Sequence, residues 1–302
     1  IASSREALGV DGETIYRVPS LKDDEATRLF VERATKAEPR FRLTDANASF
    51  VASICSRLDG IPLAIELAAA RVKLLTPEQI AARLDDRFKL LTGGVRTALP
   101  RQQTLRALID WSYQLLNATE QRALRGLSVF SGGWTLEAAE SVVGADEALD
   151  GLSGLVNKSL VIVEEQEGKS RYRFLETIRQ YAMEKLVESG EAIATRDRHL
   201  DFMLGVMEYS PTRMFGTEDI ELLNQIESEH DNLRIALEWA TENHPATALK
   251  LAYSAGGFWT IRDYNAEAQF WCITILRKTE AMSELEEDRG RLYGLLGWLM
   301  MT

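Results

Sequence analysis

Apolar residues recur at helical spacing on both sides of a glycine–proline joint near residue 60. The pattern predicts one helix from Asp45 to Leu58 and a second from Pro62 to Leu74. Gly60 stands where a helix-terminating residue adopts a left-handed conformation, and Pro62 stands where the first helical turn needs no N–H. The apolar faces comprise Phe50, Ile54 and Leu58 in the first helix and Leu63, Leu67, Ala70 and Leu74 in the second.

The same periodicity predicts two neighbouring helices. One runs from Asp24 to Ala37. The other begins at the capping box Thr76-Pro77-Glu78-Gln79 and carries Ile80, Leu84 and Phe88. Four helices of this kind predict a small helical domain, which we place at residues 21–92. Residues 91–103 contain two glycines, a proline and few apolar residues, which is typical of a linker.

Helices followed by a β-hairpin are predicted next. The helices span 105–116, 119–127, 136–143 and 149–157, and the strands span 160–163 and 172–174 around the polar stretch 164–171. A closing helix carries Leu175, Ile178, Ala182 and Leu186. This order is typical of a winged-helix module, which we place at residues 93–190.

From about residue 220 onward the pattern is helical throughout. Apolar stripes recur in pairs of helices with a period of roughly 34 residues, which is typical of tetratricopeptide-type repeats. We therefore predict the start of an α-helical repeat array within residues 191–302. The stripes comprise Ile226, Leu233, Leu237 and Ala240, then Leu249, Ala252, Ala255 and Trp259, then Phe270, Ile273 and Leu276, then 292–299.

The composition is that of a globular protein. The chain has 302 residues, 45% hydrophobic and 27% charged, which suits two or three globular domains. No apolar run approaches the roughly 20 residues that span a bilayer. Cys55 and Cys272 lie in apolar helical patterns, and with no signal peptide visible we expect a reducing cytoplasm. Because the chain begins at Ile1 and ends within an apolar pattern, we expect a fragment of a longer protein.

No catalytic or metal-binding motif is complete in this sequence. Gly168-Lys169-Ser170 resembles the end of a phosphate-binding loop, but Val163 stands where the first glycine belongs and the triplet lies at a hairpin tip. Three scattered histidines and two cysteines do not predict a metal site, and no nucleophile–base pair is evident. We therefore expect this chain alone to have no catalytic residues and no metal site.

The run Leu58-Asp59-Gly60-Ile61-Pro62-Leu63-Ala64 resembles the Gly-x-Pro-Leu motif of STAND/NB-ARC nucleotide switches. The resemblance extends through 66–71, 90–105 and 175–182 and is closest to bacterial LuxR/AfsR-like regulators with a winged helix and helical repeats. It implies that residues 1–20 end a nucleotide-binding α/β domain. It also implies that Pro62 packs on the adenine of ATP or ADP, with Gly60 and Leu63 beside it, and that Arg5 reaches the γ-phosphate.

One motif departs from that family. Where the family carries Met-His-Asp, whose histidine contacts the β-phosphate of ADP, this chain has Leu175 and Glu176. A leucine cannot donate to a phosphate, so this chain lacks the side chain that holds the family's ADP-bound off state. An ordinary amphipathic helix also explains Leu175 and Ile178.

The winged helix also invites a DNA-binding hypothesis. The helix in the recognition position, 149–157, has one acid and no base before Lys158, and the chain has a net charge of −11. DNA-binding surfaces need lysine and arginine to displace counterions and to contact base edges. We therefore expect this segment not to bind DNA directly, as in the family, where the module covers the nucleotide.

The fold class expected is mainly α: a helical domain, a winged helix with a small β-hairpin, and the start of a repeat array. The resemblance implies part of an ATP/ADP-dependent switch that regulates transcription or a related output through nucleotide-gated oligomerisation. The longer protein would be a slow ATPase using Mg²⁺, whose ligands lie outside this chain. A protein or small-molecule inducer would bind the repeats, and no membrane would be involved. The alternative is a helical-repeat interaction scaffold without nucleotide.

Overall fold

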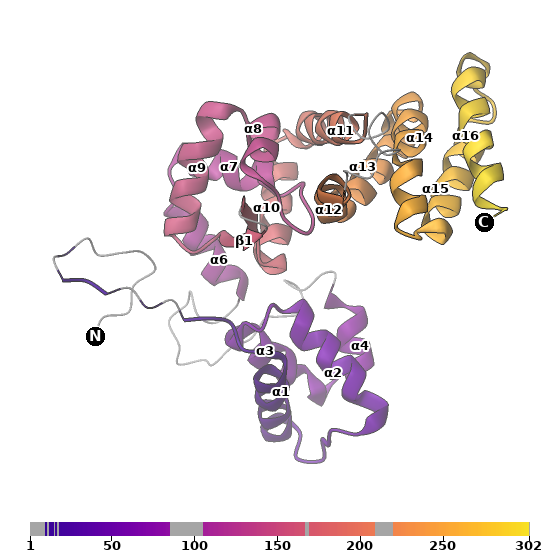
Figure 1. The fold of residues 1–302 in the computed structure, drawn as a ribbon. Coiled ribbons are helices and arrows are strands. Elements are labelled where there is room, and N and C mark those ends of the chain that lie inside the picture. Colours follow the sequence, from indigo (N-terminus) through magenta and orange to yellow (C-terminus); the bar gives the residue numbers. More distant parts are fainter. Residues whose placement is uncertain are drawn as a thin grey trace. The chain divides into compact units, whose positions relative to one another are not determined.

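The computed structural model is mainly helical and describes residues 10, 12–14, 16, 18–84, 105–166, 169–208 and 220–301 (Figure 1). The described chain divides into two compact units. The first comprises residues 1–121, 153–162 and 174–182, and the second comprises 122–152, 163–173 and 183–302. The predicted fold class is confirmed: helices predominate, with a single antiparallel pair of strands among the described residues.

The first unit contains the predicted group of four helices near the glycine–proline joint. α1 packs on α2 and α3, and α2 packs on α4. Their buried residues include Phe30, Ile54, Ile65 and Ile80, none of which is exposed to solvent. The bounds are α1 (Asp23–Ala37), α2 (Asp45–Arg57), α3 (Pro62–Ala69), the 3₁₀ turn η1 (Ala70–Lys73) and α4 (Pro77–Ala82). The unit also holds α6 (Leu105–Gln114) and parts of α7 (Ala118–Leu127), α9 (Ala145–Asn157) and α10 (Glu176–Glu188).

Two details of this unit differ from the sequence prediction. The helix expected to reach Leu74 ends at Ala69 and tightens into η1, so Leu74 turns away from the core and is 79% exposed. The helix after Thr76 ends at Ala82, and Leu84 is buried just beyond it. Phe88 and the whole predicted linker lie outside the described residues. The capping box itself is present, because Thr76 accepts a hydrogen bond from the backbone N–H of Gln79.

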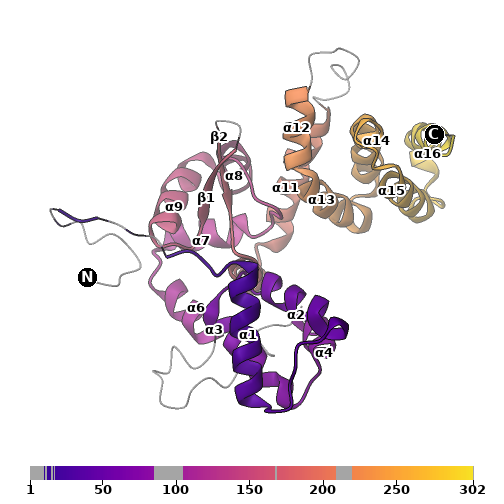
Figure 2. The same cartoon turned by 60° about the horizontal axis from the view of Figure 1, so that its bottom comes forward.

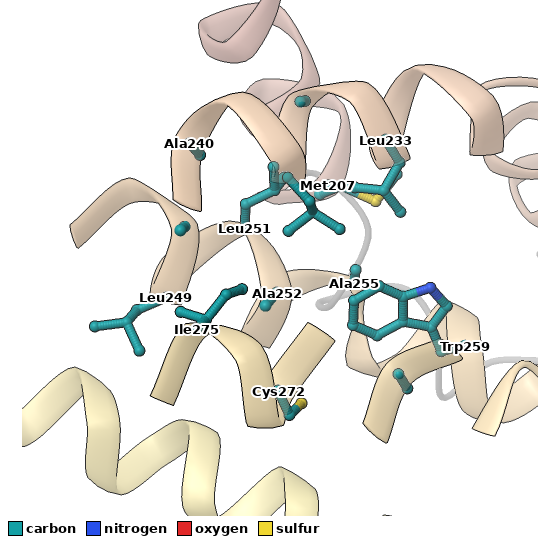
Figure 3. Close-up of a cluster of buried hydrophobic side chains, with 14 of the residues drawn as sticks. Met207, Leu233, Ala240, Leu249, Leu251, Ala252, Ala255, Trp259, Cys272 and Ile275 are labelled. Atoms are coloured by element: carbon teal, nitrogen blue, oxygen red, sulfur yellow. The ribbon is translucent and has the colours of Figure 1, made fainter. Parts of the chain in front are cut away.

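The second unit contains the hairpin and the repeat helices. α11 packs on α8, α13 and α14, and α14 packs on α15 and α16. Met207, Leu233, Ala252, Trp259 and Ile275 are part of the apolar core of this region (Figure 3). The bounds are α8 (Leu136–Val143), β1 (Ile162–Gln166), β2 (Lys169–Arg173), α11 (Ala192–Glu208), α12 (Ile220–Ser228), α13 (His230–Asn243), α14 (Pro245–Ile261), α15 (Asn265–Lys278), the 3₁₀ turn η4 (Ser283–Leu285) and α16 (Glu286–Leu299).

The hairpin has longer strands and a shorter turn than predicted: the first strand begins later, at Ile162, and the second begins earlier, at Lys169 (Figure 2). The apolar pair Leu160 and Val161 was expected to begin the first strand, but both are buried in the turn after α9, where Leu160 N–H bonds the Leu155 carbonyl. The strands instead use the polar residues expected to form the loop. Phe270 is a second correction, because it is 60% exposed while Cys272 and Ile275 of the same helix are fully buried.

A buried polar network joins β2 to the start of α13. Arg171 Nη1 donates to Glu229 Oε1 at 2.6 Å, and Arg171 Nη2 donates to the Ser228 carbonyl at 2.5 Å and the Gly133 carbonyl at 3.1 Å. Asn232 adds bonds to Gly133 and Glu229, and its Oδ1 accepts from Ser131 N–H at 2.7 Å. Because buried charges are stable only when paired and hydrogen-bonded, this network fixes the hairpin on the first repeat helices.

His199 lies beside this network on α11. Its side chain is 2% exposed, it meets the edge of Phe130 at a centroid distance of 5.0 Å, and Nε2 has no hydrogen-bond partner among the described residues. Burial lowers the pKa of His199 to about 4, from 6.5. The folded protein therefore holds a neutral imidazole that the unfolded chain would protonate first.

This histidine predicts a pH dependence of stability. The folded-state pKa lies below the unfolded value, so the contribution is present above about pH 6.5 and is lost as the pH falls toward about 4. A difference of this size corresponds to roughly 3 kcal/mol. Urea unfolding of the wild type and of His199→Leu across that range should show the wild type losing more stability. Parallel pH profiles for the two proteins would contradict the assignment.

Candidate functional site

The glycine–proline joint is a turn of two successive left-handed residues. Asp59 has a φ of 56° and Gly60 a φ of 63°. Gly60 N–H bonds the Cys55 carbonyl at 3.2 Å and Asp59 N–H bonds the Ser56 carbonyl at 2.9 Å, closing α2. Such bonds satisfy carbonyls that the end of a helix would otherwise leave without partners.

Gly60 is required here by crowding as well as by its φ. A Cβ on Gly60 would lie 2.3 Å from the carbonyl oxygen of Leu21, and Leu21 N–H donates back to the Gly60 carbonyl at 3.0 Å. Leu21, just before α1, therefore packs directly against the backbone of the turn at Gly60. Both the chain direction and this contact depend on the missing side chain.

Pro62 is the first residue of α3 and lies exposed, while Leu63 is half-buried and Ala64 and Ile65 are fully buried. The proline ring is thus an apolar, accessible surface fixed to a buried helix. This arrangement fits a planar apolar ring better than it fits a charged group. The residues of the motif present no donor side chain for phosphate.

The side chain of Asp59 points from the same turn to the start of α10. Its Oδ1 accepts from Glu176 N–H at 3.0 Å, and its Oδ2 accepts from Thr177 N–H at 3.0 Å and from the Thr177 hydroxyl at 2.9 Å. Two segments singled out in the sequence, 58–64 and 175–182, therefore meet. The sequence did not single out Asp59, because its partners are 117 and 118 residues away.

The remaining candidate residues from the sequence are Arg5, the loop-like triplet, Leu175 and Glu176. Arg5 lies outside the described residues, as does Gly168 of the loop-like triplet. Leu175 is half-buried just ahead of α10, and the Glu176 carboxylate binds Arg179 at 2.7 and 2.8 Å. Among the described residues, no cluster of His, Cys, Asp or Glu could hold a metal ion.

Both cysteines are structural residues of the core. Cys55 and Cys272 are buried free thiols, as their apolar patterns predict. Burial raises the pKa of Cys55 to about 11 and that of Cys272 to about 12, so both stay protonated and unreactive near neutral pH. No helix within the described ranges is long and apolar enough to cross a membrane.

A separate cleft of about 930 Å³ lies in the second unit. Phe202, Val206 and Leu222 give it apolar walls, and Arg171 and Glu229 of the buried network reach its edge. It contains none of the residues predicted from the nucleotide-switch resemblance. Its polar groups at Arg171 are already paired within the protein.

Several bases of the winged-helix region are paired with carboxylates of the same chain. α9 begins at Ala145, earlier than predicted, and its exposed positions include Asp146, Leu149 and Asp150 but no lysine or arginine. Lys158 Nζ is 2.6 Å from Glu120, with side chains 19% and 7% exposed. Further ion pairs in this region are Arg122–Glu147, Arg125–Glu191, Arg171–Glu229, Arg173–Glu164, Arg179–Glu176 and Lys185–Glu188.

Residues 116–187 match the protein family described as "Winged helix-turn-helix domain". The match confirms the winged helix predicted from the order of helices and strands. It lies inside the segment 93–190 assigned to this module from the sequence. All four predicted domain ranges, this one included, stay predictions.

Two kinds of mycobacterial relative are similar to this chain. A candidate HTH-type transcriptional regulator of Mycobacterium tuberculosis is 46% identical over 283 residues, which are 91% of this chain and 32% of the regulator; Mycobacterium bovis has an equally similar protein of that kind. An uncharacterised Mycobacterium tuberculosis protein is 44% identical over 206 residues, 66% of this chain and 52% of that protein. The chain thus spans about a third of the length of the regulators.

The turn geometry gives one prediction. Gly60→Ala should destabilise the protein by roughly 2–4 kcal/mol, because a methyl group adds backbone strain and collides with the Leu21 carbonyl. Gly190→Ala is the matched control, since Gly190 has a φ of 77° but no atom within 4 Å of its added Cβ. Chemical denaturation measures both variants. Equal effects of the two substitutions would remove the special role of the Leu21 contact.

The ion pairs give a second prediction. The chain should show no sequence-selective DNA binding at physiological salt, where specific binders reach roughly 10⁻⁸–10⁻¹¹ M. A double variant, Asp146→Arg with Asp150→Arg, should gain weak, salt-sensitive binding because it adds exposed bases to α9. Fluorescence anisotropy over a library of random duplexes tests both proteins. Selective, salt-sensitive binding by the wild type would defeat the prediction.

Proposed function

We propose that this chain is part of an ATP/ADP-dependent switch that regulates transcription or a related output through nucleotide-gated oligomerisation. The observation that carries the proposal is the turn at Asp59–Pro62. Pro62 presents an exposed apolar ring, and Asp59 of the same turn binds the start of α10. The regulator names of the longer relatives support a transcriptional output.

In the proposed switch, ADP would be held between a nucleotide-binding domain and the segments described here. Pro62 and Leu63 would contact the purine, and Gly60 would keep the turn close to Leu21. Arg5 would approach the γ-phosphate, as the resemblance implies. The nucleotide supplies a difference in binding free energy between closed and open states, without which no ligand can shift the equilibrium.

Leu175 changes how such an off state could be held. It has no hydrogen-bond donor, so it cannot replace the histidine that contacts phosphate in the resembled family. Glu176, in the place of the family's aspartate, is occupied by Arg179. The closed form would therefore depend on contacts between protein segments. An inducer on the helical repeats would favour the open form, which would then oligomerise.

A second candidate function is DNA binding through the winged helix. The match of residues 116–187 to a winged helix-turn-helix domain favours it. The acidic exposed face of α9 and the paired bases weigh against it, since phosphate would have to displace carboxylates already in place. In the switch proposal the module acts within the protein. A helical-repeat scaffold without nucleotide is the third candidate.

The variant Pro62→Glu, made in a longer protein that contains this chain, separates the nucleotide switch from the scaffold without nucleotide. If Pro62 lines the adenine site, a charged side chain should weaken ADP and ATP binding about tenfold or more, a loss of roughly 1.4 kcal/mol. Helix folding should survive, because glutamate is tolerated in the first turn of a helix. Calorimetric titration with ADP measures the affinity, and circular dichroism measures the helix content.

Glu78→Gln is a useful control, because it changes one charge in the first turn of α4, outside the proposed site. It should leave the ADP affinity unchanged. Equal ADP affinities for wild type and Pro62→Glu, with intact helices, would remove Pro62 from the site and favour the scaffold.

A further inference from the structure

A leucine occupies the position of the N-terminal cap of α10. This residue is Leu175, whose carbonyl already accepts from the N–H groups of Ile178 and Arg179. A leucine side chain cannot accept the first free N–H groups of a helix, whereas Ser, Thr, Asp or Asn could. An acceptor for the N–H groups of Glu176 and Thr177 comes from a residue far away in the sequence.

Asp59 supplies that acceptor with both carboxylate oxygens. One oxygen accepts from Glu176 N–H, and the other accepts from Thr177 N–H and from its hydroxyl. Thr177 is fully buried, so water cannot replace the carboxylate at that residue. A carboxylate at a helix N-terminus also has a favourable interaction with the helix dipole.

The position of the carboxylate is fixed by its own turn. Asp59 stands in the left-handed conformation between the end of α2 and Gly60, and its N–H is bonded to the Ser56 carbonyl. Pro62 lies three residues further along the same short segment. A displacement of the turn must therefore move the cap away from α10 or carry α10 with it.

α10 has separate anchors that do not involve Asp59. Tyr181 Oη donates to Asp110 Oδ1 of α6 at 2.7 Å, and its ring meets Tyr113 of α6 at a centroid distance of 5.7 Å. The Glu176–Arg179 pair lies within the helix. Loss of the Asp59 contact would therefore free the first turn of α10 from α2 and α3 while the rest of the helix stays on α6.

We infer that Asp59 is a positioning residue that couples the Gly60–Pro62 turn to the first turn of α10. The three hydrogen bonds form a breakable link between the two segments, and it takes the place of a local helix cap. A role of the link in switching depends on the proposed function: when nucleotide binding moves the turn at Pro62, the link moves the first turn of α10 with it. The link itself exists without nucleotide and can be tested without it.

The test is amide hydrogen exchange of the full 302-residue chain, with no nucleotide present. Asp59→Asn is the informative variant, because asparagine tolerates the left-handed conformation but places an NH₂ group against one of the α10 donors. The amides of Glu176 and Thr177 should exchange about tenfold faster in this variant, the effect of losing a helix cap. Amides in α2, α3 and the later turns of α10 should keep their wild-type rates.

Two further variants complete the test. Asp24→Asn removes the same charge from the first turn of α1 and should leave α10 unchanged. Thr177→Val removes one of the three bonds and should give a smaller increase than Asp59→Asn. Unchanged exchange at residues 176 and 177 in Asp59→Asn would overturn the inference. So would an equal increase in α2 and α3, which would show that Asp59 serves only its own turn.

Discussion

The first unit depends on one short turn in which two successive residues are left-handed. Asp59 and Gly60 end α2, redirect the chain into α3, and bring Leu21 against the backbone. The same geometry aims the Asp59 carboxylate at a helix more than a hundred residues later. Termination of one helix, the start of the next and the capping of a third thus share a single backbone conformation. A change in the conformation of this turn would therefore disturb α2, α3 and the start of α10 together.

The charge distribution weighs against a nucleic-acid surface on this winged helix. The lysines and arginines that phosphate contact would require are largely engaged with carboxylates, as in the pairs Lys158–Glu120 and Arg171–Glu229. The Arg171 network also shows that the hairpin serves as a structural connection to the first repeat helices. Fold and function are separable in this module, since the winged-helix shape does not by itself supply a basic face.

Local patterns made most of the helices predictable, because apolar periodicity and caps act over a few residues. The capping box at Thr76 and the glycine and proline at positions 60 and 62 belong to this kind. The hairpin was predicted but its strand bounds were wrong, because an exposed two-stranded ribbon does not need apolar residues, whereas Leu160 and Val161 are buried in the core. α11 was missed, and the Asp59 contact was not foreseen. A side chain that caps a distant helix leaves no mark in the sequence around either residue.

We propose that nucleotide bound at the Pro62 turn is coupled to α10. Amide exchange of a longer protein containing this chain, measured with and without saturating ADP, tests it most directly. ADP should slow exchange both in residues 58–66 and in residues 175–179, because one bound ligand stabilises the turn and the link that joins it to α10. Bound ADP that changes the first segment alone, or neither segment, would contradict it.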